Sequence, residues 1–300
     1  DAGTASNPLA STGIRAPSLP CPGFFPCSGW SNRTDSYRKS IRYPVEFFVI
    51  PLAAILVSAI SLFSGFGLGT LLMPAFALFF PAHIAVALTA VVHSLNNFFR
   101  FFRLRKRSDR GAVIRFGIPA VPSALAGALL LDYLSQVEPF YSYSIGGRVF
   151  NITILNTTIG FLIAVFAFLE VSRRFRNVAF DRKYLPLGGV LSGFFGGLSG
   201  HQGAFRSMFL LRSGLSKDAF IATGVTAAMM VDIPRLSVYA SQIAGIRSEH
   251  YLLLGTAVLS ALLGSFLAEK AIPKVTMSTV RNIITGMLVL VSFGLMAGLI

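Results

Sequence analysis

The sequence predicts an all-α membrane protein made of two inverted repeats, each a broken helical hairpin followed by three transmembrane helices. Of the 300 residues, 54% are apolar and only 13% are charged, whereas a soluble domain carries about 25% charged residues. Long apolar segments alternate with short basic ones, and two apolar stretches are interrupted by clustered glycines. This composition argues against a soluble enzyme, a disordered basic tail and a small disulfide-rich domain.

Six uninterrupted apolar segments are long enough to cross a bilayer, which takes about 20 residues in a helix. They are residues 82–102, 115–134, 150–170, 218–240, 251–269 and 279–300. We expect each of them to form one transmembrane helix.

Two further apolar regions contain glycines that break a helix. Residues 44–80 are interrupted by Ser64-Gly65-Phe66-Gly67-Leu68-Gly69, and residues 184–212 by five glycines from Gly193 to Gly203. Glycines at this density let a helix end and leave backbone groups free. Such backbone is tolerated at membrane depth only where protein or a cavity surrounds it. We expect each region to form two helical pieces that meet at a broken tip.

The basic segments set the orientation and the division into repeats. The formal charge is +14, and residues 103–115 and 173–183 are basic segments between apolar runs. Short Lys/Arg-rich loops prefer the cytoplasm, so we place both there and expect no nucleic-acid partner. The chain then divides into an irregular N-terminal tail over residues 1–43, a first transmembrane repeat over 44–170, a basic cytoplasmic linker over 171–183 and a second transmembrane repeat over 184–300.

The tail is expected on the extracellular or periplasmic side of a plasma or inner membrane. Cys21 and Cys27 can close a short disulfide there, and Asn32-Arg33-Thr34 is a glycosylation sequon that has meaning only outside. The basic residues just before the first helix favour the opposite side. Whether the two cysteines pair is left open.

An internal repeat follows from this topology. A shift of 135 residues places Asn97 on Asp232 and Arg100 on Arg235, and aligns the two glycine breaks. The order of elements carries this interpretation more than the few identities do. Inverted repeats with broken helices are typical of secondary transporters.

Arg206 is the sharpest functional candidate, because an arginine at the centre of a membrane helix costs about 2.5–3.5 kcal/mol on insertion scales. It lies just past the second break. A fixed cation beside free helix N-termini is an anion site, and the planar guanidinium suits the oxygen pair of a carboxylate, sulfonate or sulfite. The alternative is a structural ion pair or a side chain that reaches the inner surface.

Other residues of the two breaks are assigned to the same anion. His201 and Gln202 either donate hydrogen bonds to it or cap the broken backbone. The remaining expected contributors are Gly200, Gly203, Gly65, Gly67, Gly69 and Asn97. The glycines have an alternative role as small-residue contacts between helices, because Gly65 and Gly69, Gly193 and Gly197, and Gly196 and Gly200 are each four residues apart.

A second group of ionisable residues is assigned to ion coupling or gating. Asp232 and Arg235 lie three residues apart, so either they neutralise each other, or Asp232 or a histidine carries a coupling proton. Arg100 is the repeat mate of Arg235, and His93 lies one turn before Asn97.

Enzyme chemistry has little support. No Cys, His, Asp and Glu cluster has the spacing of a metal site, and we expect neither a metal nor another cofactor. Gly197-Leu198-Ser199-Gly200 looks like the serine motif of rhomboid intramembrane proteases. A nucleophilic serine needs a base within reach, and His250 is at a helix end. An intramembrane serine protease is therefore the least favoured alternative.

The second break resembles a known family signature. Ser192-Gly193-Phe194-Phe195-Gly196-Gly197-Leu198-Ser199-Gly200-His201-Gln202-Gly203-Ala204-Phe205-Arg206-Ser207 resembles the second-half signature of the sulfite exporter TauE/SafE family, and Leu215–Gly224 and Val231–Arg235 are similar to it as well. Residues 64–69 and Pro74 resemble its first-half break, while Leu88-Thr89-Ala90 departs from its usual Thr-Ser pair. The resemblance covers residues 44–300 and implies a multi-pass carrier that exports sulfite, sulfoacetate or other sulfonates.

Together, the residues predict a secondary transporter of small anions that works by alternating access, and the resemblance supplies sulfur and the direction of export. An anion channel with the same site is the alternative function. The expected partners are a small anionic substrate and the lipid bilayer, with proton coupling open. The sequence does not set the oligomeric state.

Overall fold

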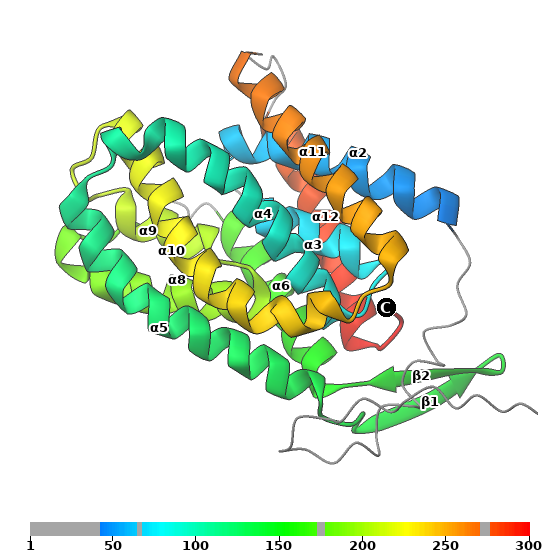
Figure 1. Cartoon of the computed structure of the whole chain (residues 1–300). Helices are drawn as coiled ribbons and strands as arrows, with labels where there is room; N and C mark the ends of the chain where they lie inside the picture. The colour runs from blue at the N-terminus through cyan, green and yellow to red at the C-terminus, as the bar shows by residue number, and fades with distance from the viewer. Residues whose placement is uncertain (1–42, 65–67, 173–177, 271–276) are drawn as a thin grey trace, which may run out of the picture. The chain divides into compact units, whose positions relative to one another are not determined.

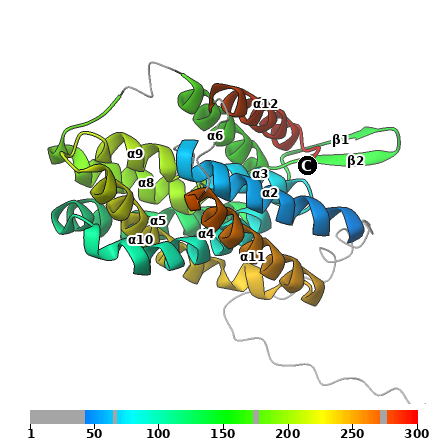
Figure 2. The same ribbon diagram turned by 90° about the horizontal axis from the view of Figure 1, so that it is seen from above.

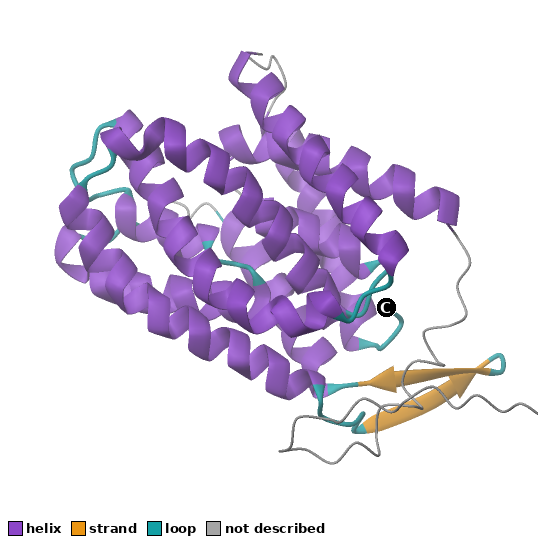
Figure 3. Ribbon diagram, in the orientation of Figure 1, coloured by secondary structure: helices purple, strands orange, loops and turns teal. Residues whose placement is uncertain are grey.

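Helices form most of the described chain, which in this computed structural model comprises residues 43–64, 68–172, 178–270 and 277–300 (Figure 1, Figure 3). The first half contains α2 (Tyr43–Ser64), α3 (Leu68–Ala77), α4 (Ala82–Leu104), α5 (Arg110–Ser135) and α6 (Ile154–Val171). The second half contains α8 (Leu185–Ser199), α9 (Gly203–Leu210), α10 (Lys217–Ala244), α11 (Ser248–Lys270) and α12 (Met277–Met296). Two short 3-10 helices, η2 (Arg105–Arg107) and η3 (Arg182–Tyr184), precede α5 and α8.

The two halves share one order of elements. In each, two helices separated by a short interruption are followed by three more helices. This order confirms the predicted helical composition of the halves, whereas their inverted relation stays a prediction. The predicted tail, the cysteine pair, Gly65 and Gly67 lie outside the described residues.

The helices have the length and surface of a membrane protein. Within the described ranges, four helical segments are long and apolar enough to cross a bilayer: Ala82–Arg107, Arg110–Ser135, Lys217–Ala244 and Ser248–Ala268. α6 and α12 contain shorter apolar segments. Large apolar side chains on the outside, such as Phe48, Phe168 and Leu290, are 66–74% exposed. Apolar surface of this extent is typical of helices that face lipid.

The second glycine break is present where the sequence predicts it. α8 ends at Ser199, and Gly200 then adopts the left-handed conformation at φ +81°, which a residue without a Cβ reaches at no steric cost. The chain continues into α9 at Gly203. In the first half, α2 ends at Ser64 and α3 begins at Leu68, and the three residues between them lie outside the described part of the chain.

A β-hairpin replaces part of one predicted loop and helix. Strands β1 (Tyr141–Ile145) and β2 (Arg148–Ile152) pair antiparallel through a turn at Gly146 and Gly147, both with positive φ. The predicted helical start at residue 150 is therefore wrong, and α6 begins at Ile154. Alternating aromatic and polar residues followed by a Gly-Gly turn favour a hairpin, and the apolar content of 150–153 concealed that pattern.

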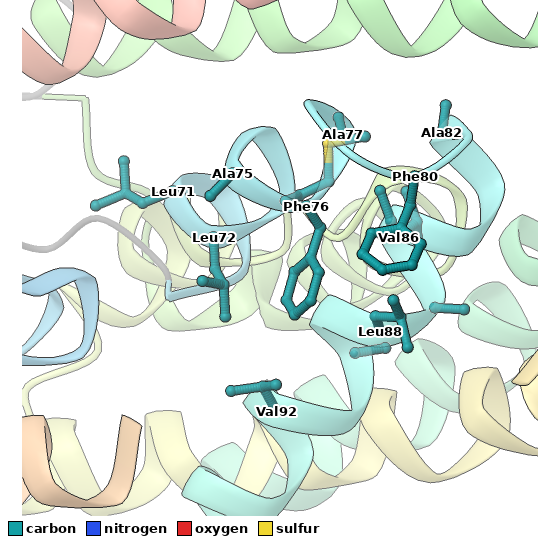
Figure 4. Packing of buried hydrophobic residues seen from close by; sticks show 14 of the residues in the cluster. Leu71, Leu72, Ala75, Phe76, Ala77, Phe80, Ala82, Val86, Leu88 and Val92 are labelled. Carbon is teal, nitrogen blue, oxygen red and sulfur yellow. The ribbon is translucent and has the colours of Figure 1, made fainter. Parts of the chain in front are cut away.

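The core is built around the short helix α3, whose ten residues are all buried. α3 packs on α4 and α12, and the two ribbon views show it enclosed by longer helices (Figure 1, Figure 2). Leu72 and Phe76 of α3 lie near Leu88 and Val92 of α4 in the close view (Figure 4). This packing holds the end of the first break at a fixed place inside the bundle.

Glycines allow α8 to lie directly on α5. A Cβ at Gly189, Gly193 or Gly197 would collide with the α5 backbone at Phe116, Ala120 or Ala124, respectively. These glycines are four residues apart and so share one face of α8. The expected helix-contact role of Gly193 and Gly197 is confirmed, and α5 thereby supports the helix that leads into the second break.

Gly193→Ala is expected to destabilise the protein by about 1–3 kcal/mol, the usual cost of overpacking. The added Cβ would stand 2.9 Å from the Ala120 Cα atom, which belongs to backbone and cannot rotate away. Thermal unfolding in detergent measures the effect. Gly255→Ala is the matched control, because a Cβ there meets nothing within 4 Å. Equal melting temperatures for the two variants would contradict this account of the helix contact.

Candidate functional site

The start of α3 meets the second break beside α4. A Cβ built on Gly69, at the start of α3, would lie 2.9 Å from the carbonyl oxygen of Gly200 and 3.9 Å from Cδ2 of His93. Only glycine permits this approach without moving the backbone. The start of α3 therefore reaches the second break, and α4 lies against both.

A buried carboxylate lies at the centre of this region. Asp232 of α10 is 0% exposed, and Arg235 Nη2 lies 2.6 Å from its Oδ1 atom. His93 Nδ1 of α4 lies 2.9 Å from Oδ2, and the Gln202 side-chain amide donates to Oδ1 at 2.9 Å. Asn97 donates a longer bond of 3.4 Å to Oδ2. Asp232 thus connects α4, α10 and the second break through one set of charge-assisted hydrogen bonds.

Arg235 is a structural partner of this carboxylate. Besides the ion pair, its Nη1 atom donates to the Gly196 carbonyl oxygen at 2.9 Å, and the side chain is 1% exposed. This bond satisfies a carbonyl near the end of α8. The predicted ion pair between Asp232 and Arg235 is present, and a coupling proton on Asp232 or a histidine stays a prediction.

Arg206 of α9 has fewer protein partners than Arg235. Its Nη1 atom donates to Gln202 Oε1 at 3.4 Å, and no described carboxylate lies within 4 Å of it. Nε and Nη2 make no hydrogen bond within the described part of the chain, and the residue is half-buried. The alternative of a structural ion pair therefore does not apply to Arg206 among the described residues.

Charges of both signs lie near Arg206. Asp232 attracts its guanidinium, and Arg100 and Arg235 repel it. Asp232 is itself paired with Arg235 and hydrogen-bonded to His93, so it is shared between the two arginines.

Gln202 joins the two parts of the site. Its amide group donates to Asp232 at 2.9 Å and accepts from Arg206 at 3.4 Å, while the hydroxyl of Ser192 donates to its backbone carbonyl at 2.9 Å. Because a carboxylate only accepts and a guanidinium only donates, the amide nitrogen faces Asp232 and the amide oxygen faces Arg206. Gln202 therefore fixes the position of the guanidinium relative to the buried carboxylate.

His201 caps the broken backbone. Its Nδ1 atom is 2.9 Å from the Ser199 carbonyl oxygen, and its ring stacks on Phe166 of α6 at 4.9 Å. Because a carbonyl only accepts hydrogen bonds, Nδ1 carries the proton of the neutral ring. Nε2, which is buried and has no partner among the described residues, is then an acceptor. A neutral His201 has no N–H left for an anion.

The sequence analysis missed Tyr239 and Ser192 as parts of this region. The Tyr239 hydroxyl, which is fully buried, donates to the carbonyl oxygen of Gly197. Tyr239 lies one turn after Arg235, and this spacing is the signal that could have identified it. Ser192 is one turn before Gly196, and nothing in its neighbourhood in the sequence indicated its bond to Gln202.

A comparison with known protein families identifies the family of this chain. The family described as sulfite exporter TauE/SafE matches residues 50–295. The chain belongs to this family. No curated protein and no solved structure matches it significantly.

Family membership adds the general function to the geometry. As a TauE/SafE protein, the chain is a multi-pass membrane transporter from a family of sulfite exporters, which act on small anions across a lipid bilayer. The resemblance found in the glycine-rich segment is thereby confirmed. In the described part of the TauE/SafE chain, no three His, Cys, Asp or Glu side chains are grouped as metal ligands.

Asp232→Asn is expected to destabilise the protein by about 3–5 kcal/mol, because it leaves the buried Arg235 without a counter-charge. Unfolding of purified protein by heat or denaturant measures the change. Asp218→Asn is the control: its side chain is 64% exposed and pairs with Arg107 at 3.0 Å, and exposed pairs contribute about 0–1 kcal/mol. A loss in Asp232→Asn no larger than that in Asp218→Asn would show that the buried pair does not hold the site together.

Proposed function

We propose that this protein is a secondary transporter that exports small oxyanions, sulfite, sulfoacetate or other organosulfonates, by alternating access. The observation that carries the proposal is the state of Arg206. Its guanidinium lies beside the second break, and two of its nitrogens, Nε and Nη2, have no acceptor among the described residues. A cation inside a membrane protein is energetically costly when it has no carboxylate partner, and binding of an anion offsets this cost.

The broken backbone supplies further donors. α9 begins at Gly203, so the N–H groups of its first turn lack partners within the helix. Gly200 and Gly203 are buried and carry no side chain that would stand between these N–H groups and an anion. We propose that these N–H groups bind the anion together with Arg206, with Gly69 bringing the first break alongside.

The two halves provide the moving parts. His93 and Asn97 belong to α4 in the first half, while Asp232 and Arg235 belong to α10 in the second. If the halves are inverted repeats that rock against each other, this shared network changes on every cycle. We propose that Arg100, which lies one turn beyond Asn97 on the same helix, takes part in that gating.

A proton is the coupling ion that this network accommodates best. Asp232 accepts from His93, Asn97, Arg235 and Gln202 in the present arrangement. Protonation of the carboxylate would weaken these contacts, and with them the link between α4 and α10. We propose that proton binding at the His93–Asp232 pair and movement of the two halves are linked in this way.

The serine protease alternative lacks a base. The Ser199 hydroxyl donates to the Phe195 carbonyl oxygen at 3.1 Å. The nearest imidazole atom, His201 Nδ1 at 3.1 Å, carries a proton for the reason given above. A nitrogen that already donates cannot take the proton of the serine, which argues against Ser199 as a nucleophile.

Arg206→Ala is expected to abolish anion uptake by proteoliposomes, because the charged hydrogen bonds to the anion are lost. Counterflow of labelled sulfite or sulfoacetate measures transport. Arg206→Lys keeps the charge without the planar pair of N–H groups and is expected to lose at least about tenfold in apparent affinity. Arg247→Ala is the control, since its side chain is 51% exposed and pairs with Glu249.

Unchanged counterflow in folded Arg206→Ala protein would contradict the proposal. Trans-side substrate accelerates uptake by a carrier, whereas a channel with the same site gives electrical currents without such acceleration. The same vesicles therefore separate the two alternatives.

A further inference from the structure

We propose that Gly224 of α10 determines the size of the anion, by leaving room for an organic substituent beside the Nε–Nη2 edge of Arg206. The inference rests on the proposed function. It assigns a specificity role to a residue that lies away from both helix breaks, and it narrows the substrate class toward organosulfonates.

One edge of the Arg206 guanidinium has no protein acceptor among the described residues. Nη1 is engaged by Gln202 Oε1 at 3.4 Å, whereas Nε and Nη2 have no acceptor among the described residues. These two nitrogens present parallel N–H groups along one side of the planar group. A sulfonate or carboxylate binds such an edge with two oxygens at once. The anion is therefore expected side-on at Nε and Nη2, opposite the bond to Gln202.

Gly224 lies against the Nε end of this edge. A Cβ at position 224 would be 3.6 Å from Arg206 Nε and 3.9 Å from Arg206 Cδ, and no other neighbouring helix would come within 4 Å of it. The missing side chain thus leaves the space of one methyl group beside Nε. An anion held at Nε and Nη2 that carries a carbon substituent would extend into this space, whereas the compact sulfite ion would need less of it.

Helix packing does not account for this glycine. A Cβ at Gly193 or Gly197 would collide with the α5 backbone, but one at Gly224 would make only ordinary contacts with a side chain. Gly224 is inside the 28-residue helix α10, where glycine is less favourable than alanine. The small residue therefore reduces helix stability at a position where no neighbouring helix requires it.

Gly224→Ala tests the inference. The apparent KM for sulfoacetate in counterflow is expected to rise about tenfold, the effect of roughly one misplaced methyl group, while that for sulfite changes less than about twofold. Gly255→Ala is the matched control, because it adds the same methyl group to a helix where nothing lies within 4 Å. It should leave both values unchanged.

The possible outcomes separate this inference from the proposed function. If the wild type carries neither anion, the proposed function fails. If Arg206→Ala loses transport but Gly224→Ala alters neither KM, or alters both equally, only the role of Gly224 is overturned. Loss of folding in Gly224→Ala, with Gly255→Ala folded, would also overturn it, because Gly224 would then be a packing residue.

Discussion

The rest of the site depends on the buried carboxylate of Asp232. A lone carboxylate in this environment would carry a large desolvation cost, and here it is offset by an ion pair with Arg235 and by donors from α4 and Gln202. Because these donors come from both halves of the chain, the same contacts that stabilise the charge also set where the helices lie. The position of the second break, and therefore of Arg206, follows from them.

The two arginines near this carboxylate have separate tasks. Arg235 pairs with Asp232 and donates to the Gly196 carbonyl oxygen, so its role is structural. Arg206 is held at one nitrogen by Gln202 and keeps its other edge free of protein acceptors among the described residues. Gln202 separates them, since its amide bonds to the carboxylate on one side and to the free cation on the other. This division allows an anion to bind without dismantling the link between the halves.

The sequence predicted the features of this structure that depend on residues close together in the chain. Apolar length and the glycine cluster before Gly203 placed the second break, and the three-residue spacing of Asp232 and Arg235 indicated an ion pair. Contacts between distant segments carry no such signal. His93 and Asp232 are hydrogen-bonded although their sequence separation is 139, and the approach of Gly69 to Gly200 depends on how α3 packs. The hairpin over 141–152 was missed because its apolar second strand runs into α6, and Gly224 was noted only as part of a family signature. The inverted relation of the halves and the roles of the site residues remain predictions.

Anomalous diffraction from crystals grown with selenite, the selenium analogue of sulfite, tests the central claim most directly. The account predicts a selenium peak between the two helix breaks, with oxygens about 3 Å from Nε and Nη2 of Arg206. Arg235 should remain paired with Asp232 in the same crystals. Selenium bound only elsewhere, or a protein carboxylate on the free edge of Arg206, would contradict the claim that this guanidinium is kept available for an anion.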